Sequence, residues 1–579
     1  MTINDDLSVT NSEWKIKNTD FATIEFIKQR YKLSDLTARV LASRIEIIDK
    51  QSCDNYLNPY IKHLLPDPYH LKDMDLAIKR IIKAINDKEK IIIYGDYDVD
   101  GATSSALMKN YFSAINIKSD IYIPDRIKEG YGPNSKALTK LKQEENFSLC
   151  LMLDCGTVAF EPLEVAHSIN LDVIVVDHHI SKEELPKAVA VINPNRIDQE
   201  SVMSDSCAVA VSFLLLVALQ RALINNSYFT NNNLKEVDLM SFLDLVALGT
   251  VCDVMKLTGL NRAFVKQGLK IMTKRKNLGL TTLCDKLDIK EAPSVYHLGY
   301  VIGPHINAGG RIGESYSGAH LLSTKNEAEA DDIAIKLQDY NKLRKEIEQD
   351  AVKSALKMID TDQYVVVAHE DWHPGIIGIV AGRIKEVMNL PAIVISIDEK
   401  TNIGKASARS VNNFNIGSFI LEAKDNGILI EGGGHAMAGG FSIDMKKIIE
   451  LKNFLYKSIQ HHKFTKILYA DAITTIEGIN RSLWDDLQKL TPYGHGNQEP
   501  RIIIMNIKLL NMKLIAGSHM ICDICCIYSN KKIKGINFKT INNKLLLDGF
   551  NQGNATNVFG KIMLNDWNKS LEFMIEDIK

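Results

Sequence analysis

Five short, almost uninterrupted apolar runs in the first half of the chain constrain its fold more than any other feature. They lie at residues 91–94 (IIIY), 121–123 (IYI), 148–153 (SLCLML), 173–176 (VIVV) and 189–192 (VAVI), and helical patterns separate most of them. A strand that is apolar along its whole length is buried on both faces, as strands are in a parallel sheet covered by helices. The sequence therefore predicts an α/β fold built on a parallel sheet.

The patterns on either side of these runs divide the rest of the chain. After the sheet region, apolar residues follow one helical stripe in a charged background, which is typical of a helix between two domains. The final section alternates short β-like runs with Asn and Gly turns, which favours a small barrel or sandwich. We expect a helical segment at residues 1–75, the parallel-sheet domain at 76–322, a linker helix at 323–358, a smaller α/β domain at 359–462 and a β-barrel at 463–579.

The composition is that of an ordinary globular protein. The 579 residues suggest roughly four domains. A formal net charge of −2 leaves no basic excess for coating nucleic acid, so any positive surface must be local. Nine cysteines make no disulfide scaffold in so long a chain, and the polar start MTINDDLSVTNSEW has no signal-peptide pattern. The longest apolar stretch, residues 208–219, is too short to cross a bilayer and predicts a buried helix, so we expect a cytoplasmic protein.

Acidic residues and histidines stand where the apolar segments end. The first strand runs into YGDYDVDG, the third into LMLDCGTV and the fourth into VVDHHI, while FLDLVALGTVCDVM places a further acid after an apolar segment and a Gly-Thr turn. Ligands of open parallel sheets bind just past the carboxyl ends of the strands, so we expect these side chains to converge. They are Asp96, Asp98, Asp100, Asp154, Asp177, His178, His179 and Asp253.

The chemistry of this set points to metal ions. Carboxylates packed together repel one another and lose their hydration unless cations lie between them. A pair of divalent ions meets that need, and a mixture of oxygen and imidazole ligands suits Mn²⁺ or Mg²⁺ better than a thiolate zinc site does. Such a pair polarises a phosphate oxygen and supplies a hydroxide for in-line displacement. A helix N-cap is the alternative for one acid such as Asp154, but independent caps need not all follow strands.

The ordered motifs YGDYDVDG, LMLDCGTV, VVDHHI and GTVCDVM resemble those of the DHH phosphoesterase superfamily. Further segments look like the RecJ family of bacterial single-strand DNA exonucleases: IPDRIKEGYG, GPHINAGGRIG, WHPGIIGIVAGRI, KASARS and GGGHAMAGGF. PYGHGNQEP, at residues 492–500, resembles the start of that family's oligonucleotide-binding (OB) barrel. The resemblance covers nearly the whole chain beyond the first segment. It implies a DHH domain, a DHH-associated domain joined to it by a long helix with the active cleft between them, and an OB-type barrel.

The resemblance also implies roles for individual residues. The metal-ligand positions match Asp96, Asp98, Asp100, Asp154, His178 and Asp253, with Asp154 as the bridge. The positions that act in catalysis match Asp154, His178, His179 and His435. The positions that grip the substrate and its 5′-terminal phosphate match Arg126, Asn307, Arg311, Ser407, Arg409, Gly433, Gly434 and His435. Arginine forks and a hydroxyl suit a phosphate dianion, and the three glycines are expected to form a loop able to cradle one.

Several positions leave more than one interpretation open. His179 either contacts phosphate or orients the ligands, and Asp177 is expected to end its strand and accept nearby hydrogen bonds. His305 stands where the family's usual arginine follows Gly-Pro, and because histidine is shorter and only partly charged, this weakens the case for a phosphate contact there. The run CDICC at residues 522–526 fits buried core cysteines better than zinc ligands. The basic stretch around Phe538 is either a solvated strand edge or a surface for stacking single strands.

The activity implied by the resemblance is that of a single-stranded-DNA-specific 5′-to-3′ exonuclease. It would use two Mn²⁺ or Mg²⁺ ions and release 5′-mononucleotides in DNA repair and recombination. One alternative is a DHH phosphodiesterase for short oligoribonucleotides or cyclic dinucleotides, against which the C-terminal barrel argues. The other is a non-catalytic replication scaffold, against which the complete set of acids argues. The implied partners are a single-strand-binding protein and a RecQ-type helicase, and we expect a monomer without membrane attachment.

Overall fold

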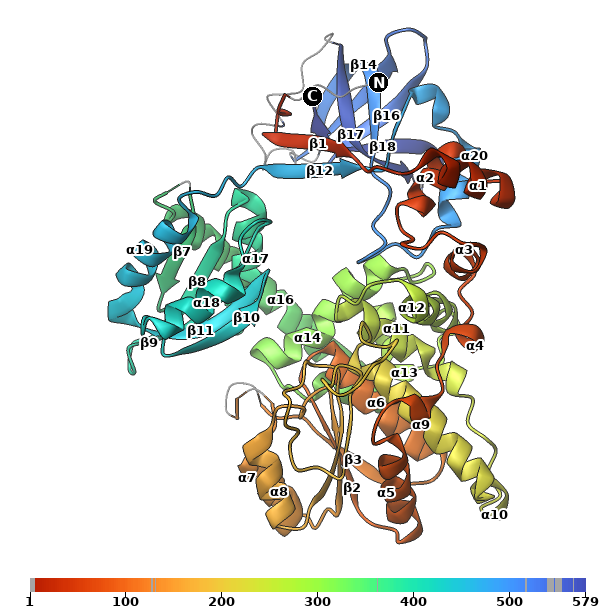
Figure 1. The fold of residues 1–579 in the computed structure, drawn as a ribbon, viewed down its shortest axis with the longest axis vertical. Helices are drawn as coiled ribbons and strands as arrows, with labels where there is room; N and C mark the ends of the chain where they lie inside the picture. Colours follow the sequence, from red (N-terminus) through yellow and green to blue (C-terminus); the bar gives the residue numbers. More distant parts are fainter. Residues whose placement is uncertain are drawn as a thin grey trace. The chain divides into compact units, whose positions relative to one another are not determined.

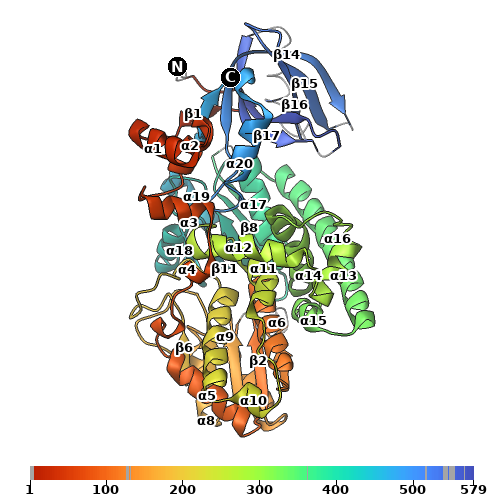
Figure 2. The ribbon, with the colours of Figure 1, turned by 90° about the vertical axis from the view of Figure 1, so that its right-hand side faces the viewer.

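The chain forms two compact units in a computed structural model. Unit 1 comprises Met1–Ile48, Leu343–Lys489 and Glu499–Lys579, and unit 2 comprises Asp49–Lys342 and Leu490–Gln498. Figures 1 and 2 show the helices and strands of both units. The structure describes residues 6–125, 129–130, 132–361, 363–515, 518–538, 546, 555–565 and 567–579.

Unit 2 is built on a five-stranded parallel sheet in the order β3-β2-β4-β5-β6, as the apolar runs predict. The ends of three strands are level, because Gly95 of β2 pairs with Leu153 of β4, which pairs with Val176 of β5. β2 lies between β3 and β4, so the strand order reverses there, at the position where open parallel sheets bind ligands. The strands are β2 (Ile91–Gly95), β3 (Ser119–Tyr122), β4 (Leu149–Leu153), β5 (Asp172–Val176) and β6 (Ala190–Ile192).

Helices cover both faces of this sheet. Alternate residues of a strand point to opposite faces. Leu151 therefore packs in one core with α5, α6 and α9, whereas its neighbour Cys150 packs in another with α7 and α8. The helices are α5 (Met74–Asn86), α6 (Val99–Ala114), α7 (Ser135–Gln143), α8 (Phe160–Ser168) and α9 (Ala208–Asn225).

Further helices of unit 2 pack around α6 and α9. Helix α9 continues six residues beyond the apolar stretch 208–219, so the expectation that it is too short to cross a bilayer is wrong: within the described part of the chain, α9 alone is long and apolar enough to do so by length and composition. The expected burial is confirmed, because 67% of the helix is buried inside the protein. The other elements are α3 (Lys50–Leu57), α4 (Ile61–Leu64), the 3₁₀ turns Pro68–His70 and Leu239–Phe242, α10 (Tyr228–Asn231), α11 (Leu243–Cys252), α12 (Gly259–Met272), α13 (Leu278–Lys286), the π-helix His297–Ile302, α14 (Gly303–Ile312) and α15 (Ser317–Ser323). The long linking helix is α16 (Glu327–Lys357).

The second α/β region, in unit 1, has a mixed sheet in the order β10-β11-β9-β8-β7. One face packs against α17 and the other against α18 and α19. The GGGH run is the edge strand β10 and not the loop expected from its glycines, because their backbone groups pair with β11 without help from side chains. The elements are β7 (Val365–His369), α17 (Ile377–Met388), β8 (Ala392–Asp398), β9 (Ile403–Arg409), α18 (Ile416–Asp425), β10 (Glu431–His435), β11 (Ala438–Asp444), the 3₁₀ turn Met445–Lys447 and α19 (Ile448–Ile459).

The C-terminal strands form the predicted barrel. Their order is β13-β14-β15-β16-β18-β17, and β14 also pairs with β17, which closes the sheet. Cys522 is buried in β15, and all three cysteines of the CDICC run are free. In the basic stretch, Lys534 pairs with Asp523, and Lys539 lies outside the described residues. The strands are β13 (Ala472–Thr474), β14 (Ile502–Ile515), β15 (His519–Cys526), β16 (Lys532–Asn537), β17 (Ala555–Leu564) and β18 (Leu571–Ile578).

The N-terminal segment is not wholly helical as expected, because it begins with a strand. β1 (Ser12–Ile16) pairs in parallel with β12 (Lys466–Ala470), and the indole Nε1 of Trp14 donates to Asp577 Oδ2 at 2.8 Å. Both partners come from the far end of the sequence, so no local pattern reveals the pairing. The remaining elements are α1 (Phe21–Tyr31), α2 (Asp35–Ala42), the 3₁₀ turn Ile476–Gly478 and α20 (Arg481–Gln488).

Candidate active site

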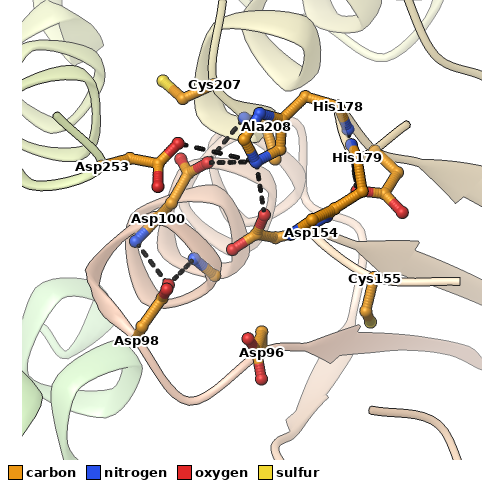
Figure 3. A network of polar contacts seen from close by, with 12 residues as sticks. Asp96, Asp98, Asp100, Asp154, Cys155, His178, His179, Cys207, Ala208 and Asp253 are labelled. Atoms are coloured by element: carbon orange, nitrogen blue, oxygen red, sulfur yellow. Dashed lines mark hydrogen bonds and ion pairs between the residues drawn. The ribbon is translucent and has the colours of Figure 1, made fainter. Parts of the chain in front are cut away.

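The strand ends of unit 2 bring the predicted acids and histidines together (Figure 3). Asp154 follows β4 and His178 follows β5, while Asp96 and Asp98 occupy the turn between β2 and α6 and Asp100 lies in the first turn of α6. Asp253 ends helix α11. The prediction of a Gly-Thr turn before Asp253 is wrong, because Gly249 and Thr250 lie inside that helix. A fully buried apolar run has no periodicity that distinguishes a helix from a strand. The acid cluster comprises Asp96, Asp98, Asp100, Asp154, His178 and Asp253.

His178 lies at the centre of this cluster. Its Nε2 is 3.3 Å from Asp154 Oδ1, 3.5 Å from Asp253 Oδ2 and 3.9 Å from Asp100 Oδ2. Asp154 and His178 each belong to two groups of possible ligands, and so connect them. The groups whose ligand atoms lie within 4.8 Å of one another are Asp96/Asp98/Asp154, Asp154/His178/His179 and Asp100/His178/Asp253.

The acid cluster fits divalent cations. Among the described residues, Asp154 Oδ1 and Asp253 Oδ2 are buried without a hydrogen-bond donor. Burial and neighbouring carboxylates raise the pKa of Asp154 well above its usual value, that of Asp253 to about 9 and that of Asp100 to about 7. Burial and the nearby charge of His179 lower the pKa of His178 to about 4, which leaves its Nε2 lone pair available. Oxygens that lack donors beside a neutral imidazole are a ligand set for Mn²⁺ or Mg²⁺.

Helix N-termini hold two of the acids in place. Asp98 caps α6, and its Oδ1 accepts from the backbone N–H groups of Asp100 (2.9 Å) and Gly101 (3.1 Å). The carboxylate of Asp100 accepts from Ala208 N (2.6 Å) and Val209 N (2.9 Å) at the start of α9. These bonds and the helix dipoles favour the charged, oriented carboxylates. The α9 contact was missed from the sequence, where only the abrupt start of the apolar run after Cys207 marks it.

The second histidine is oriented by a buried acid. Asp177 accepts from His179 Nδ1 (2.7 Å) and from the backbone of His178 (2.7 Å) and Thr157 (3.0 Å), as expected for the residue that ends its strand. Burial alone would raise the pKa of Asp177, but these hydrogen bonds outweigh it and lower that pKa. The hydrogen bond to Asp177 in turn raises the pKa of His179 to about 9, so its ring is cationic at neutral pH.

Two asparagines that sequence reasoning missed support the histidines. Asn193 Nδ2 donates to the carbonyl of His179 at 2.8 Å, and Asn195 Nδ2 donates to that of His178 at 2.5 Å. Both follow β6, so the signal was present: they are polar residues after an apolar strand, like the acids.

Helix α14 carries Asn307 and Arg311 against the acidic turn. A Cβ on Gly310 would lie 2.7 Å from the Tyr97 ring, so glycine permits this close approach. Asn307 and Arg311 are four residues apart and share a helix face. His305 is committed to the helix packing instead: Nδ1 donates to Val301 O at 2.6 Å, and Nε2 accepts from Asn341 at 2.9 Å. Arg126 lies outside the described residues.

The remaining predicted substrate residues lie together in unit 1. Ser407 and Arg409 are on β9, and Gly433, Gly434 and His435 are on β10. The guanidinium Nη1 of Arg409 donates to Ser407 Oγ at 3.1 Å, and burial lowers its pKa. Residues paired across neighbouring strands point to the same face. The β9–β10 face is formed by the paired rows Gly433–Gly440–Ser407 and His435–Ala438–Arg409.

The fold and the acids at its strand ends are those of a DHH-family protein. The model of the DHH family N-terminal domain matches residues 90–250, the DHHA1 domain matches residues 361–461 and the RecJ OB domain matches residues 470–577. These three matches coincide with the parallel sheet, the mixed sheet and the closed barrel.

Full-length relatives define the family more closely. The single-stranded-DNA-specific exonuclease RecJ of Bacillus subtilis (strain 168) is 31% identical over 577 residues, covering 97% of this chain and 70% of that protein. The protein of the same name from Salmonella typhimurium (strain LT2) is 29% identical over 538 residues, covering 90% and 92%. The crystal structure of RecJ from Thermus thermophilus in complex with Mn²⁺ has a TM-score of 0.80 at 24% identity, covering 98% and 79%. The chain belongs to the RecJ family.

Proposed function

We propose that the chain is a metal-dependent exonuclease that degrades single-stranded DNA from the 5′ end and releases 5′-mononucleotides, in DNA repair and recombination. The observation that carries this proposal is the acid cluster, with two buried carboxylate oxygens that lack donors at the point where the strand order reverses. The relatives are named as single-stranded-DNA-specific exonucleases, and the closed barrel distinguishes the chain from phosphodiesterases that lack one.

Two Mn²⁺ or Mg²⁺ ions would be held by Asp96, Asp98, Asp100, Asp154, His178 and Asp253. Asp154 is the proposed bridge, because it belongs to ligand groups on both sides of the cluster. When bound, such a pair lowers the pKa of a water molecule and neutralises charge on the scissile phosphate. The bonds from the α6 and α9 N-termini fix the carboxylates before substrate arrives, so little reorganisation is needed.

The cationic groups are proposed to bind phosphate. His179, held by Asp177, can donate a charged hydrogen bond to the scissile phosphate. Arg409 and Ser407 offer a fork and a hydroxyl to a terminal phosphate, and Gly433 leaves the backbone of the β9–β10 face open beside them. His435 is proposed to act in catalysis by donating to the scissile phosphate, and the backbone of Gly434 is proposed to contact the substrate there. Asn307, Arg311 and Arg126 are proposed to contact the strand as well.

The barrel is proposed to bind the single strand beyond the cleaved end, as OB-type barrels do through basic and aromatic side chains. We propose that the chain works as a monomer in the cytoplasm. A single-strand-binding protein and a RecQ-type helicase are its proposed partners, because one covers and the other generates the substrate.

Strands labelled at either end test the function directly. Purified protein with Mn²⁺ is given single strands labelled at the 5′ or the 3′ end, with duplex of the same sequence as a control. We expect labelled mononucleotide to appear first from the 5′ label, and the duplex to remain intact. Early release of mononucleotide from the 3′ label alone would refute the proposed polarity.

A further inference from the structure

The segment Leu490–Gln498 belongs to unit 2 although the residues before and after it belong to unit 1. The resemblance of PYGHGNQEP placed this segment at the start of the barrel. Its contacts place it on helix α12 and on the turn between α11 and α12 that begins directly after Asp253. Because the residues on either side belong to the other unit, this segment must be held in unit 2 by contacts of its own.

The main anchor is Arg262 of α12, whose side chain is fully buried. Its Nη2 donates to the carbonyls of Leu490 (2.9 Å) and Thr491 (2.7 Å), and its Nη1 donates to that of Pro492 (3.1 Å). The fully buried Asn497 supplies a second anchor, because its Oδ1 accepts from the hydroxyl of Tyr56 in α3 at 2.5 Å, while its Nδ2 closes the segment on itself through Leu490 O (3.0 Å) and Pro492 O (2.8 Å). Charged hydrogen bonds to buried carbonyls are strong, so the segment is fixed at both ends.

Between these anchors, His495 holds the turn that follows helix α11. Its Nδ1–H donates to Val254 O at 2.7 Å, and its own carbonyl accepts from Leu257 N at 2.8 Å. Glycines on both sides permit this close approach: a Cβ on Gly494 would lie 2.6 Å from the Leu257 side chain, and one on Gly496 would lie 3.0 Å from Lys256.

The turn held by His495 is strained and adjoins the acid cluster. Val254 directly follows Asp253 and has φ of +57°, which is unfavourable for a β-branched residue. It occupies the position after the helix end that is usually glycine, and the turn is closed by hydrogen bonds from Met255 N to Thr250 O (3.1 Å) and from Val254 N to Val251 O (3.2 Å). A backbone in this conformation persists only when its surroundings hold it there.

We propose that His495 is a positioning residue of the metal centre. Its hydrogen bond to the Val254 carbonyl keeps the carboxylate of Asp253 oriented toward one of the two proposed ions. The proposal rests on the proposed function, since it assumes that Asp253 binds metal. It adds a role for a residue 242 positions further along the chain, outside the acid cluster. The side chain of His495 is exposed, and its hydrogen bond goes to the Val254 carbonyl, next to Asp253.

Manganese binding to the metal-free protein tests this. Free Mn²⁺ is measured by electron paramagnetic resonance during titration of wild type, His495→Ala, His495→Asn and the control His461→Ala, which removes an exposed histidine of unit 1. We expect His495→Ala to weaken one of two sites about tenfold, the usual effect of removing a group that orients a ligand. His495→Asn should bind nearly as wild type does, because its amide N–H replaces Nδ1–H. The melting temperature of the metal-free variants should stay close to that of wild type.

The possible outcomes separate the two proposals. If wild type binds two ions and His495→Ala binds both of them as tightly as wild type does, the positioning role is overturned while the proposed function stands. If the Asn variant is as impaired as the Ala variant, the hydrogen bond to Val254 is not the cause, and the positioning role is again overturned. If wild type binds no Mn²⁺ and cleaves no strand, the proposed function itself fails.

Discussion

The acid cluster of unit 2 and the β9–β10 face of unit 1 are opposites in burial and charge. Asp100 and Asp154 are 1% and 2% exposed, and this burial, together with neighbouring carboxylates, raises the pKa values of both carboxyls. Ser407 and Arg409 are only half-buried, and Arg409 is already bonded to Ser407 Oγ and to the Ala408 carbonyl at 2.8 Å. Arg409 and Ser407 of the β9–β10 face therefore have hydrogen-bond partners within the protein, without a ligand. Two carboxylate oxygens of the acid cluster have no such partner among the described residues.

Because of this difference, substitutions in the acid cluster should change both stability and activity, whereas substitutions in the β9–β10 face should change activity alone. Buried carboxylates that lack donors destabilise the folded chain until cations bind them, so ligand and fold are coupled there. The β9–β10 face has no such coupling, and changes in it should alter substrate use while the fold stays as it is.

The largest expected effect is that of Asp154→Asn. Loss of the proposed bridging carboxylate should lower cleavage at least about 1000-fold, since it disrupts both ions. The metal-free protein should become more stable, by about 1–3 kcal/mol, because folding raises the pKa of Asp154 and so disfavours the carboxylate that the unfolded chain carries at neutral pH, whereas asparagine has no charge to disfavour. Asparagine is chosen because residue 154 has φ of +61°, which asparagine tolerates better than alanine.

Kinetics on single strands and thermal unfolding without metal measure the two effects. Asp120→Asn, an exposed acid on β3, is the matched control and should change neither. Retained turnover by Asp154→Asn would contradict the two-metal account.

Metal removal should come next in size. At 100 times the Mn²⁺ dissociation constant, each bound ion should stabilise wild type by about 2.7 kcal/mol over the chelated protein, and Asp154→Asn should be stabilised by much less. Unfolding followed with and without chelator measures this. Equal stability of the metal-bound and metal-free wild type would contradict the coupling between metal binding and folding that distinguishes the acid cluster from the β9–β10 face.

Arg409→Ala should have a smaller and more selective effect. Loss of the fork should reduce kcat/KM about tenfold on 5′-phosphorylated strands and little on 5′-hydroxyl strands. Arg383→Ala removes an exposed arginine of the neighbouring helix α17 and serves as the control. Equal losses on both kinds of end would exclude a role for Arg409 in binding the terminal phosphate.

The smallest effect is expected from Gly433→Ala. Among the described residues, neighbours in the chain aside, no atom lies within 4 Å of the added Cβ, so the protein should fold normally, but the methyl group should hinder phosphate and lower kcat/KM about threefold. Gly434→Ala is the informative companion: its Cβ would lie 2.5 Å from the Ala438 carbonyl, so stability should fall instead. Wild-type kinetics for Gly433→Ala would show that substrate does not approach this face.

Much of this contrast follows from sequence. The five strands of unit 2 were predictable because burial on both faces demands continuous apolar runs, and the acids were predictable because burial does not explain a charge at a strand end. Asn193 and Asn195 obey the same rule and could have been found with it.

Other features depend on contacts that no local pattern encodes. The β1–β12 pairing joins residues at opposite ends of the chain, and the GGGH strand exists because β11 supplies its partner. Arg262 gives no sequence signal, because its partners are backbone carbonyls and not an acid at a recognisable spacing. The helix before Asp253 was not predicted for a different reason: a short, wholly buried run has no periodicity that distinguishes a helix from a strand.

The most direct test of the central claim is anomalous diffraction from crystals grown with Mn²⁺. We predict two manganese peaks roughly 3.5–4 Å apart, with an Asp154 oxygen between them and His178 and Asp253 bound to one of the two ions. A single peak, or peaks outside the acid cluster, would contradict the account.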